Sequence, residues 1–209
     1  RCVEAVKDEE IYHVPKILYH WRCHEDSTAE NPESKTYAFD AGRRAVQEHY
    51  NRTGIHAEVK NGEFLGLYRT RFIRDYDPLI SIIIPNKDHI DDLGRCVNSI
   101  FSKGGWDNIE VIVVENNSRD KRTFDYYDKI TAENPKVKIA YYKGDFNFSA
   151  ICNLGFERAR GEHILLLNND VEFISDGFIK EMLSYSQRKD VGAVGAKLYY
   201  PDGTIQHAG

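Results

Sequence analysis

The sequence predicts an α/β fold, in which residues 79–209 form a mostly parallel sheet with helices on both faces and residues 1–78 form a small α+β appendage. After Leu79, short runs rich in Ile and Val alternate with helix-compatible segments, as in a sheet built from strand–helix–strand units. The runs are apolar at consecutive positions, which is typical of strands covered on both faces. Before Asp77-Pro78 the chain is richer in charge and poorer in long apolar runs, so we place the domain boundary there.

Within the sheet domain, the apolar runs predict strands at residues 80–84, 110–114, 137–142, 163–167 and 192–198. Between the first two, apolar residues from Leu93 to Phe101 recur at spacings of three and four, which predicts an amphipathic helix that Gly104-Gly105 ends. Each of the three later helices is expected to open on a Ser or Asp suited to capping, near Ser118 or Asp120, near Phe148 and near Asp176.

The appendage carries weaker signals. Residues 36–53 have apolar side chains at helix-compatible spacing before Gly54, which predicts a helix. In residues 55–72, apolar and polar side chains alternate on either side of Asn61-Gly62, which predicts a hairpin with its turn at those two residues. Residues 11–21 are expected to be extended.

The composition excludes several classes of function. With 28 Lys and Arg against 33 Asp and Glu, the chain has a net charge of −5 and no broad basic field for nucleic acid. Its four cysteines form no CxxC pair, which argues against a structural zinc site and favours a reducing cytoplasmic location. No apolar stretch is long enough to span a bilayer, so contact with the inner face of the membrane is expected only through segments outside this chain.

Both ends of the chain look cut. It opens at Arg1-Cys2 without a starting Met, and it stops at Gly209 directly after a strand-like segment. We therefore expect a fragment of a longer protein.

Polar side chains follow three of the predicted strands, at Pro85-Asn86-Lys87-Asp88, at Glu115-Asn116-Asn117-Ser118 and at Asn168-Asn169-Asp170. Because parallel strands end at the same edge of a sheet, where ligands of such sheets bind, these groups are expected to converge. Each also has a plainer interpretation: the first as the start of a loop, Glu115 as a solvated acid, and the third as a polar turn.

The third group is the most informative, because it follows a continuous apolar run, His163 to Leu167, which indicates a central strand. Its oxygen ligands suit a hard divalent cation, which in turn binds a diphosphate. The chain contains neither GxGxxG nor GxxxxGK[ST], so no glycine-rich loop is available to hold phosphate. A cation at Asp170 is the expected substitute.

Taken together, the segments at 81–87, 109–118, 153–156, 159–162 and 165–170 resemble family 2 glycosyltransferases of the GT-A fold, including rhamnan-synthesis-type bacterial members. The resemblance covers Leu79 to Gly209. It implies the nucleotide-sugar-binding half of a transferase domain, a donor such as a UDP- or dTDP-linked sugar, and a glycan or polysaccharide acceptor. Residues 11–22 in turn resemble the closing segment of a preceding glycosyltransferase module, which is a further expected partner; ordinary aromatic packing is the alternative.

By this resemblance, one set of residues contacts the nucleotide-sugar: Pro85, Asn86, Lys87, Glu115, Asn116, Asn147, Asn153, Asn168, Asn169 and His207. For His207, ligand contact and simple packing stay equally open. Asp170 is the implied ligand of Mn²⁺ or Mg²⁺, in a DXD-like motif whose first acid is here Asn168, so metal affinity is expected to be lower than with two carboxylates.

The resemblance also implies inverting transfer, with an acidic general base located beyond Gly209. Asp202 is a poor substitute, because Pro201-Asp202-Gly203 is a strong turn signal. Two other functions compete with the enzyme: a non-catalytic domain that keeps the fold for assembly or binding, and a nucleotide-binding module outside sugar transfer, which the missing glycine fingerprint disfavours.

Overall fold

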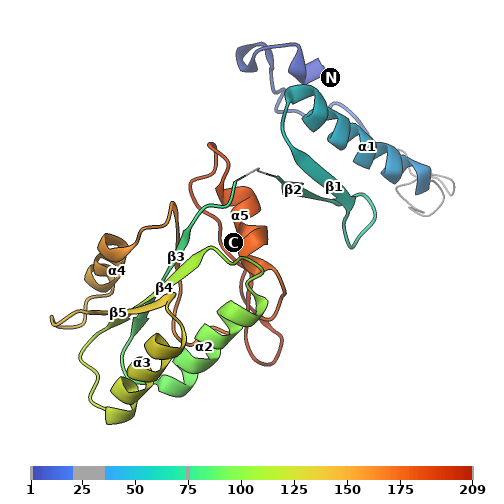
Figure 1. Ribbon diagram of the computed structural model, residues 1–209. Helices are drawn as coiled ribbons and strands as arrows, with labels where there is room; N and C mark the ends of the chain where they lie inside the picture. The colour runs from blue at the N-terminus through green and yellow to red at the C-terminus, as the bar shows by residue number, and fades with distance from the viewer. Residues whose placement is uncertain (1, 21–35, 74–75, 209) are drawn as a thin grey trace. The chain divides into compact units, whose positions relative to one another are not determined.

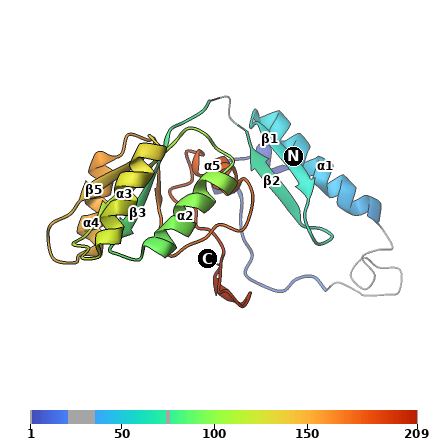
Figure 2. The same cartoon turned by 60° about the horizontal axis from the view of Figure 1, so that its bottom comes forward.

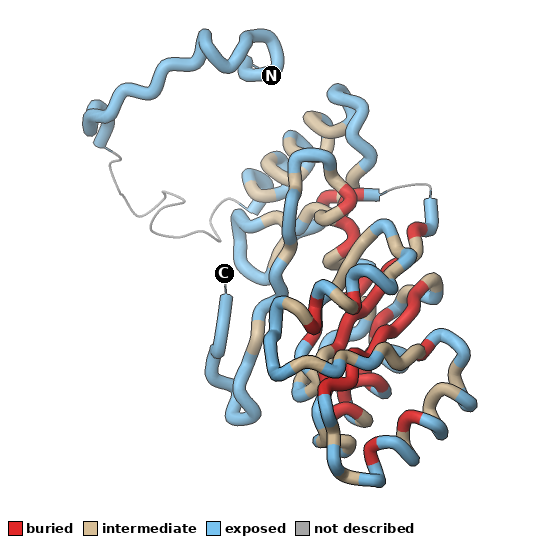
Figure 3. Tube along the Cα trace, turned by 90° about the vertical axis from the view of Figure 1, so that its left-hand side faces the viewer, coloured by how far each residue is buried: buried red, intermediate tan, exposed pale blue. Residues whose placement is uncertain are grey.

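A computed structural model of the chain describes residues 2–20, 36–73 and 76–208 (Figure 1). The chain divides into two compact units, Arg1–Arg74 and Asp75–Gly209. Most of the buried side chains lie in the second unit (Figure 3).

The first unit contains one long helix and one hairpin (Figure 1). Helix α1, Thr36–Thr53, ends before Gly54, whose φ of 70° is the left-handed conformation that terminates helices, and this confirms the predicted helix. Strands β1, Ala57–Asn61, and β2, Tyr68–Phe72, pair antiparallel. Val59 and Phe72 are buried, and the ring of Tyr50 packs edge-on against Phe72 at 5.6 Å. The unit thus has a small core of its own.

The hairpin differs from the prediction in its turn. Asn61 is still paired with Tyr68, and the connection runs over residues 62–67. The Gly62 amide donates to the Leu67 carbonyl at 2.7 Å and the Leu67 amide to the Phe64 carbonyl at 3.1 Å, so the loop contains a turn of its own. A two-residue turn at Asn61-Gly62 is therefore wrong.

The segment before α1 contains two short 3-10 helices, η1 at Cys2–Glu4 and η2 at Asp8–Glu10. Residues 11–20 form no strand, and Tyr12, Ile17 and Tyr19 are exposed. Trp21, the last residue of the predicted extended segment, lies outside the described residues.

The second unit is built on a parallel sheet in the order β5-β4-β3-β6, which confirms the predicted α/β class. The strands are β3, Ile80–Asn86; β4, Ile109–Glu115; β5, Val137–Tyr141; and β6, His163–Leu166. Each predicted strand from 80 to 167 is therefore present, within one or two residues at either end.

Helices cover both faces of this sheet (Figures 1 and 2). Because side chains alternate along a strand, Ile80, Ile82 and Ile84 face α2 (Ile90–Lys103), α3 (Lys121–Glu133) and α5 (Phe178–Ser186). Ile83 and Val114 face α4 (Phe148–Arg158) on the other side. Alternate positions along each strand thus contact the helices on opposite faces of the sheet.

The helix ends agree only in part with the predicted caps. Asp120 caps α3 by accepting a hydrogen bond from the Arg122 amide at 2.9 Å. Helix α4 is capped by Asn147, not by a Ser or Asp, and α5 begins after Gly177 with no side-chain cap. Helix α2 ends at Gly104-Gly105 as predicted, with φ of 66° at Gly105.

Two expectations about strands are wrong. Within the part of the chain that the structure describes, strand β6 pairs with β3 alone and forms one edge of the sheet, and Leu166 is 56% exposed. A continuous apolar run indicates that the faces of a strand are covered, but it does not indicate how many strands lie beside it. Residues 192–198 add no strand to this sheet; β7, Leu198–Tyr199, pairs antiparallel with β8, Ile205–His207. The predicted turn at 201–203 is present, and the Gly203 amide donates to the Tyr200 carbonyl. The residues before the turn therefore pair with those after it in a local hairpin and not with the main sheet.

Candidate functional site at the carboxyl ends of the strands

The carboxyl ends of β3 and β4 carry two buried polar side chains. Asn86 and Glu115 are the last residues of these strands, are partners in the parallel register, and are 4% and 2% exposed. Strand alternation turns both toward the face that α3 covers, where they meet the hydroxyl of Tyr127. That oxygen lies 2.7 Å from Asn86 Nδ2 and 2.7 Å from Glu115 Oε2.

The Glu115 carboxylate organises the loop that follows β4. Its Oε2 accepts a second hydrogen bond from the Ser118 hydroxyl at 2.6 Å, and its Oε1 accepts from the Ser118 backbone amide. A carboxylate has about four lone-pair positions, and described residues occupy three of them here. Glu115 is therefore the anchor of this loop.

The end of β6 is joined to the same group. Asn169 Nδ2 donates to Asn86 Oδ1 at 2.6 Å, so all three polar strand ends are connected through Asn86. Its neighbours Asn168 and Asp170 are exposed. The structure thus brings Asn86, Glu115 and Asn169 together at one edge of the sheet, with the carboxylate of Asp170 open to solvent.

Asp88 fastens the loop after β3 to the start of α3. Its Oδ1 accepts hydrogen bonds from the backbone amides of Arg119, at 2.9 Å, and Asp120, at 3.0 Å. These bonds, of which the bond from Asp120 has the larger effect, hold the pKa of Asp88 below its usual range. The positive end of helix α3 also favours the negative charge of the Asp88 carboxylate. The Asp88 amide in turn donates to the Ser118 hydroxyl at 2.7 Å.

The structure joins only some of the remaining predicted residues to this network. The Asn116 backbone amide donates to the Asn86 backbone carbonyl at 2.9 Å, and the Asn116 side-chain amide donates to the Gly144 carbonyl at 3.0 Å. Asn147 Oδ1 accepts from the Ala150 amide at 3.0 Å, which is a capping bond. Pro85 is half-buried, whereas Lys87, Asn153 and His207 are exposed, and His207 belongs to the separate β7–β8 pair.

Three residues of the network were not predicted as site residues: Asp88, Ser118 and Tyr127. Asp88 and Ser118 stand within the polar strand-end groups, so their position was a usable signal. Tyr127 reads in the sequence as one more apolar position of a helix, and nothing local indicates that its hydroxyl reaches two strand ends.

A divalent cation fits the donors at this edge. Among the described residues, no three His, Cys, Asp or Glu side chains are grouped to hold a metal on their own. Mg²⁺ and cations of similar chemistry are commonly bound through one or two carboxylates together with substrate phosphates. The exposed carboxylate of Asp170, two residues along the chain from the exposed Asn168, is a donor set of that kind.

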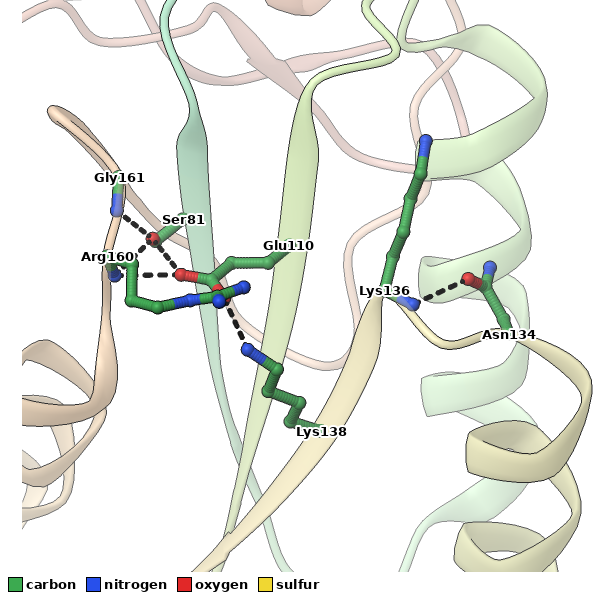
Figure 4. Close-up of polar contacts among 7 residues, drawn as sticks. All are labelled: Ser81, Glu110, Asn134, Lys136, Lys138, Arg160 and Gly161. Carbon is green, nitrogen blue, oxygen red and sulfur yellow. Dashed lines mark hydrogen bonds and ion pairs between the residues drawn. The ribbon is translucent and has the colours of Figure 1, made fainter.

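A second polar cluster lies at the amino-terminal end of the sheet and on its other face (Figure 4). Glu110, 2% exposed, accepts hydrogen bonds from Ser81 Oγ at 2.8 Å, Lys138 Nζ at 2.7 Å and the Arg160 backbone amide at 2.8 Å. Burial acts to raise the pKa of Glu110, but these bonds outweigh it and lower the pKa to about 2. The Gly161 amide donates to Ser81 Oγ at 2.8 Å, so the cluster fixes the turn between α4 and β6.

A pocket of about 360 Å³ lies beside this cluster, bordered by Lys136, Lys138 and Arg160. Its cations do not converge: Lys138 and Arg160 are paired with Glu110, whereas Lys136 extends away from Glu110 and donates to the Asp107 carbonyl at 2.5 Å (Figure 4). The candidate site is therefore the carboxyl end of the strands, where polar side chains from three strand ends are hydrogen-bonded to one another.

The second unit is thus an α/β domain whose polar strand ends meet at one edge of a parallel sheet. A mannosyltransferase from Pyrobaculum calidifontis, in complex with GDP-Man and Mn²⁺, has a similar fold; the TM-score is 0.55 at 16% identity, and the match covers 81% of this chain and 48% of that one. The sequence model described as Glycosyl transferase family 2 matches residues 81–208. The chain therefore belongs to the family 2 glycosyltransferases.

Two curated relatives match over most of the chain. An uncharacterized protein, y4gI, of Sinorhizobium fredii is 42% identical over 100% of this chain and 23% of its own length. The O-antigen biosynthesis protein RfbC of Myxococcus xanthus is 37% identical over 95% of this chain and 15% of its own length. The chain thus spans less than a quarter of either relative. None of its described helices has the length and apolar character needed to cross a membrane.

Proposed function

We propose that residues 79–209 bind the donor of an inverting glycosyltransferase, which transfers a sugar from a nucleotide-diphospho-sugar to a hydroxyl of a polysaccharide or glycan. The observation that carries the proposal is the hydrogen-bonded convergence of Asn86, Glu115 and Asn169 at one sheet edge, in a family 2 domain. Residues 1–78 are proposed as an appendage, which the separate compact unit at Arg1–Arg74 supports.

The nucleotide is proposed to lie over the ends of β3 and β4. Glu115 keeps one lone pair for an N–H of the base or a hydroxyl of the ribose. Pro85, Asn86 and Lys87 form the adjoining loop, and the exposed ammonium of Lys87 suits phosphate. The other proposed donor contacts are Asn116 in the loop after β4, Asn147 at the start of α4, Asn153 within α4, and His207 in the β7–β8 pair.

The diphosphate is proposed to lie near Asn168, Asn169 and Asp170. Asp170 would hold Mn²⁺ or Mg²⁺, and the bound cation would neutralise the charge of the leaving diphosphate. Asn169 cannot turn freely toward the ligand, because its amide donates to Asn86. Its contribution is therefore to hold the backbone of Asn168 and Asp170 in place.

Inversion requires a carboxylate that removes the proton from the acceptor hydroxyl as this oxygen attacks the anomeric carbon. We propose that this base lies beyond Gly209. The polysaccharide class of acceptor is supported by the relative named as an O-antigen biosynthesis protein, at 37% identity.

Calorimetry of the 209-residue chain with UDP, dTDP and GDP, each with and without Mn²⁺, tests the proposal. We expect one nucleotide to bind about tenfold more tightly with Mn²⁺, a difference of about 1.4 kcal/mol. Asp170→Asn should remove most of that gain without lowering the unfolding temperature, because Asp170 is exposed. Asp176→Asn, an exposed acid later in the same segment, is the matched control and should retain the gain.

The non-catalytic alternative is favoured by one observation, the single carboxylate of the Asn168-Asn169-Asp170 motif. The same titration separates the two. A folded protein that binds none of the three nucleotides refutes the enzyme proposal, and binding that does not respond to Mn²⁺ refutes the metal role of Asp170.

A further inference from the structure

We infer that Tyr127 is a positioning residue, whose buried hydroxyl couples the nucleotide side of the site at Glu115 to the diphosphate side at Asn169-Asp170. The inference rests on the proposed function and adds a residue that lies outside the strand ends. Tyr127 belongs to α3 and is 1% exposed, so it acts on the ligand only through Asn86 and Glu115.

The direction of each hydrogen bond in this chain is determined by the charge on Glu115. An ionised carboxylate only accepts, so the single proton of the Tyr127 hydroxyl is donated to Glu115 Oε2. The Tyr127 oxygen must then accept from Asn86, which places Nδ2 of the Asn86 amide toward it. Nδ2 also donates to the Asp88 carbonyl at 3.0 Å, which requires the same orientation.

The Asn86 amide therefore has one allowed orientation. Turning it over would place Oδ1 against the Tyr127 oxygen, which has no proton left, and against the Asp88 carbonyl, giving two contacts between acceptors. In the allowed orientation Oδ1 faces Asn169 and accepts from its Nδ2 at 2.6 Å. The Tyr127 hydroxyl and the Asp88 carbonyl thus act together to orient the Asn86 amide toward Asn169, so Tyr127 is linked to Asn169 through Asn86.

Burial strengthens this dependence. Between buried side chains such as Asn86, Glu115 and Tyr127, hydrogen bonds in series polarise one another and an unpaired polar group is costly. Removing the hydroxyl leaves Asn86 oriented by the Asp88 carbonyl alone and leaves Glu115 Oε2 with only the Ser118 hydroxyl. The ring itself, which packs edge-on against Phe124 at 6.1 Å, would remain in Tyr127→Phe. The substitution therefore weakens the coupling and keeps the packing.

A double-mutant cycle on the full 209-residue chain tests the coupling, with the affinity for UDP in Mn²⁺ as the readout. We expect Tyr127→Phe and Asn169→Ala each to weaken binding about tenfold. Because both break the same chain of bonds, the double variant should be about as weak as either single variant. Tyr126→Phe, the same substitution at the adjacent position of α3, should bind like the wild type.

A hundredfold loss in the double variant, equal to the product of the single losses, would overturn the inference, as would normal binding by Tyr127→Phe. A merely structural role of Tyr127 predicts a lower unfolding temperature without this non-additivity. If the wild-type chain binds no nucleotide, the proposed function has failed, and with it the ligand side of the inference.

The coupling between Tyr127 and Asn169 can also be measured without a ligand and without removing the Tyr127 hydroxyl. Incorporating 3-fluorotyrosine at position 127 retains the hydroxyl, and its ¹⁹F resonance reports the hydrogen bonding of that ring. Asn169→Ala should shift this resonance in the unliganded protein, whereas Asp176→Asn should not. An unshifted resonance in Asn169→Ala would show that the two side chains are not coupled, whatever the outcome of the nucleotide titrations.

Discussion

The buried carboxylate of Glu110 is the clearest quantitative test of the fold, because its charge is held by donors from three separate segments. Ser81 comes from β3, Lys138 from β5, and Arg160 from the turn before β6. Glu110→Gln keeps the shape of the side chain, but it removes the charge and turns an NH₂ group toward these donors. We expect it to destabilise the sheet domain.

The magnitude follows from the pKa. The pKa of Glu110 falls from an ordinary 4.5 to about 2, and each pKa unit corresponds to about 1.4 kcal/mol, which gives about 3 kcal/mol. The side chains of Lys138 and Arg160 are 43% and 65% exposed, so solvent screens part of their attraction. We therefore expect Glu110→Gln to lower the free energy of unfolding by about 2 to 3 kcal/mol at neutral pH.

The pH dependence has a defined sign. A carboxyl whose pKa is lower in the folded than in the unfolded protein stabilises the fold fully above the unfolded pKa, and this stabilisation is lost as pH falls. For Glu110 the loss should occur between pH 4.5 and about 2. The difference in unfolding free energy between the wild type and Glu110→Gln should therefore shrink by more than half between pH 7 and about pH 3.

Urea unfolding at a series of pH values, followed by circular dichroism, measures this difference. Glu133→Gln is the control, because Glu133 forms only a 4.0 Å contact with Lys129 and both side chains are exposed. A cost of Glu110→Gln that stays constant from pH 7 to pH 3 would refute the assignment of its stabilisation to the buried charge. A cost no larger than that of Glu133→Gln would refute the network itself.

Two further predictions concern packing and reactivity. Gly155→Ala should lower the free energy of unfolding by about 1 to 3 kcal/mol, because the added Cβ would lie 2.3 Å from Ile83 Cγ2. Gly192→Ala is the control and should be neutral, because a Cβ there would have no atom within 4 Å; equal unfolding midpoints for the two variants would contradict the prediction. Burial, together with the nearby charge of Asp170, raises the pKa of the Cys96 thiol to about 12. In the native protein, Cys96 should therefore react with iodoacetamide far more slowly than the exposed Cys2, which peptide mapping would measure; equal rates would contradict the prediction.

The parts of the fold that the sequence predicted correctly are those that local patterns determine. The Ile-rich and Val-rich runs at 80–84 and 110–114 are strands because each position packs against a covered face, and helix α2 has its apolar residues at the spacing that one face requires. The strand-end groups of Asn86 and Glu115 then meet because the sheet is parallel. These relations extend over a few residues or follow from one topological rule.

The errors concern choices between partners that no local pattern specifies. Strand β6 has the apolar run of a central strand, but its edge position depends on which segments remain to pair with it. Residues 192–198 contain Gly192 and Gly195, whose lack of side chains weakens a strand, and the turn at 201–203 offers a nearer partner. The role of the Tyr127 hydroxyl depends on tertiary packing in the same way.

Strand β4 carries a buried glutamate at each end, and the two differ in a way that separates stability from binding. Glu110 accepts five hydrogen bonds, from Ser81, Lys138 and three Arg160 nitrogens, which exceeds its four lone-pair positions. Glu115 accepts three from the described residues, which leaves one of about four positions. A saturated acid can fix a turn but has no acceptor left for a ligand, whereas an acid with one free position, beside an exposed Asp170, can do both. Substitutions at Glu110 should therefore change stability and leave nucleotide specificity unchanged, and substitutions at Glu115 should change both.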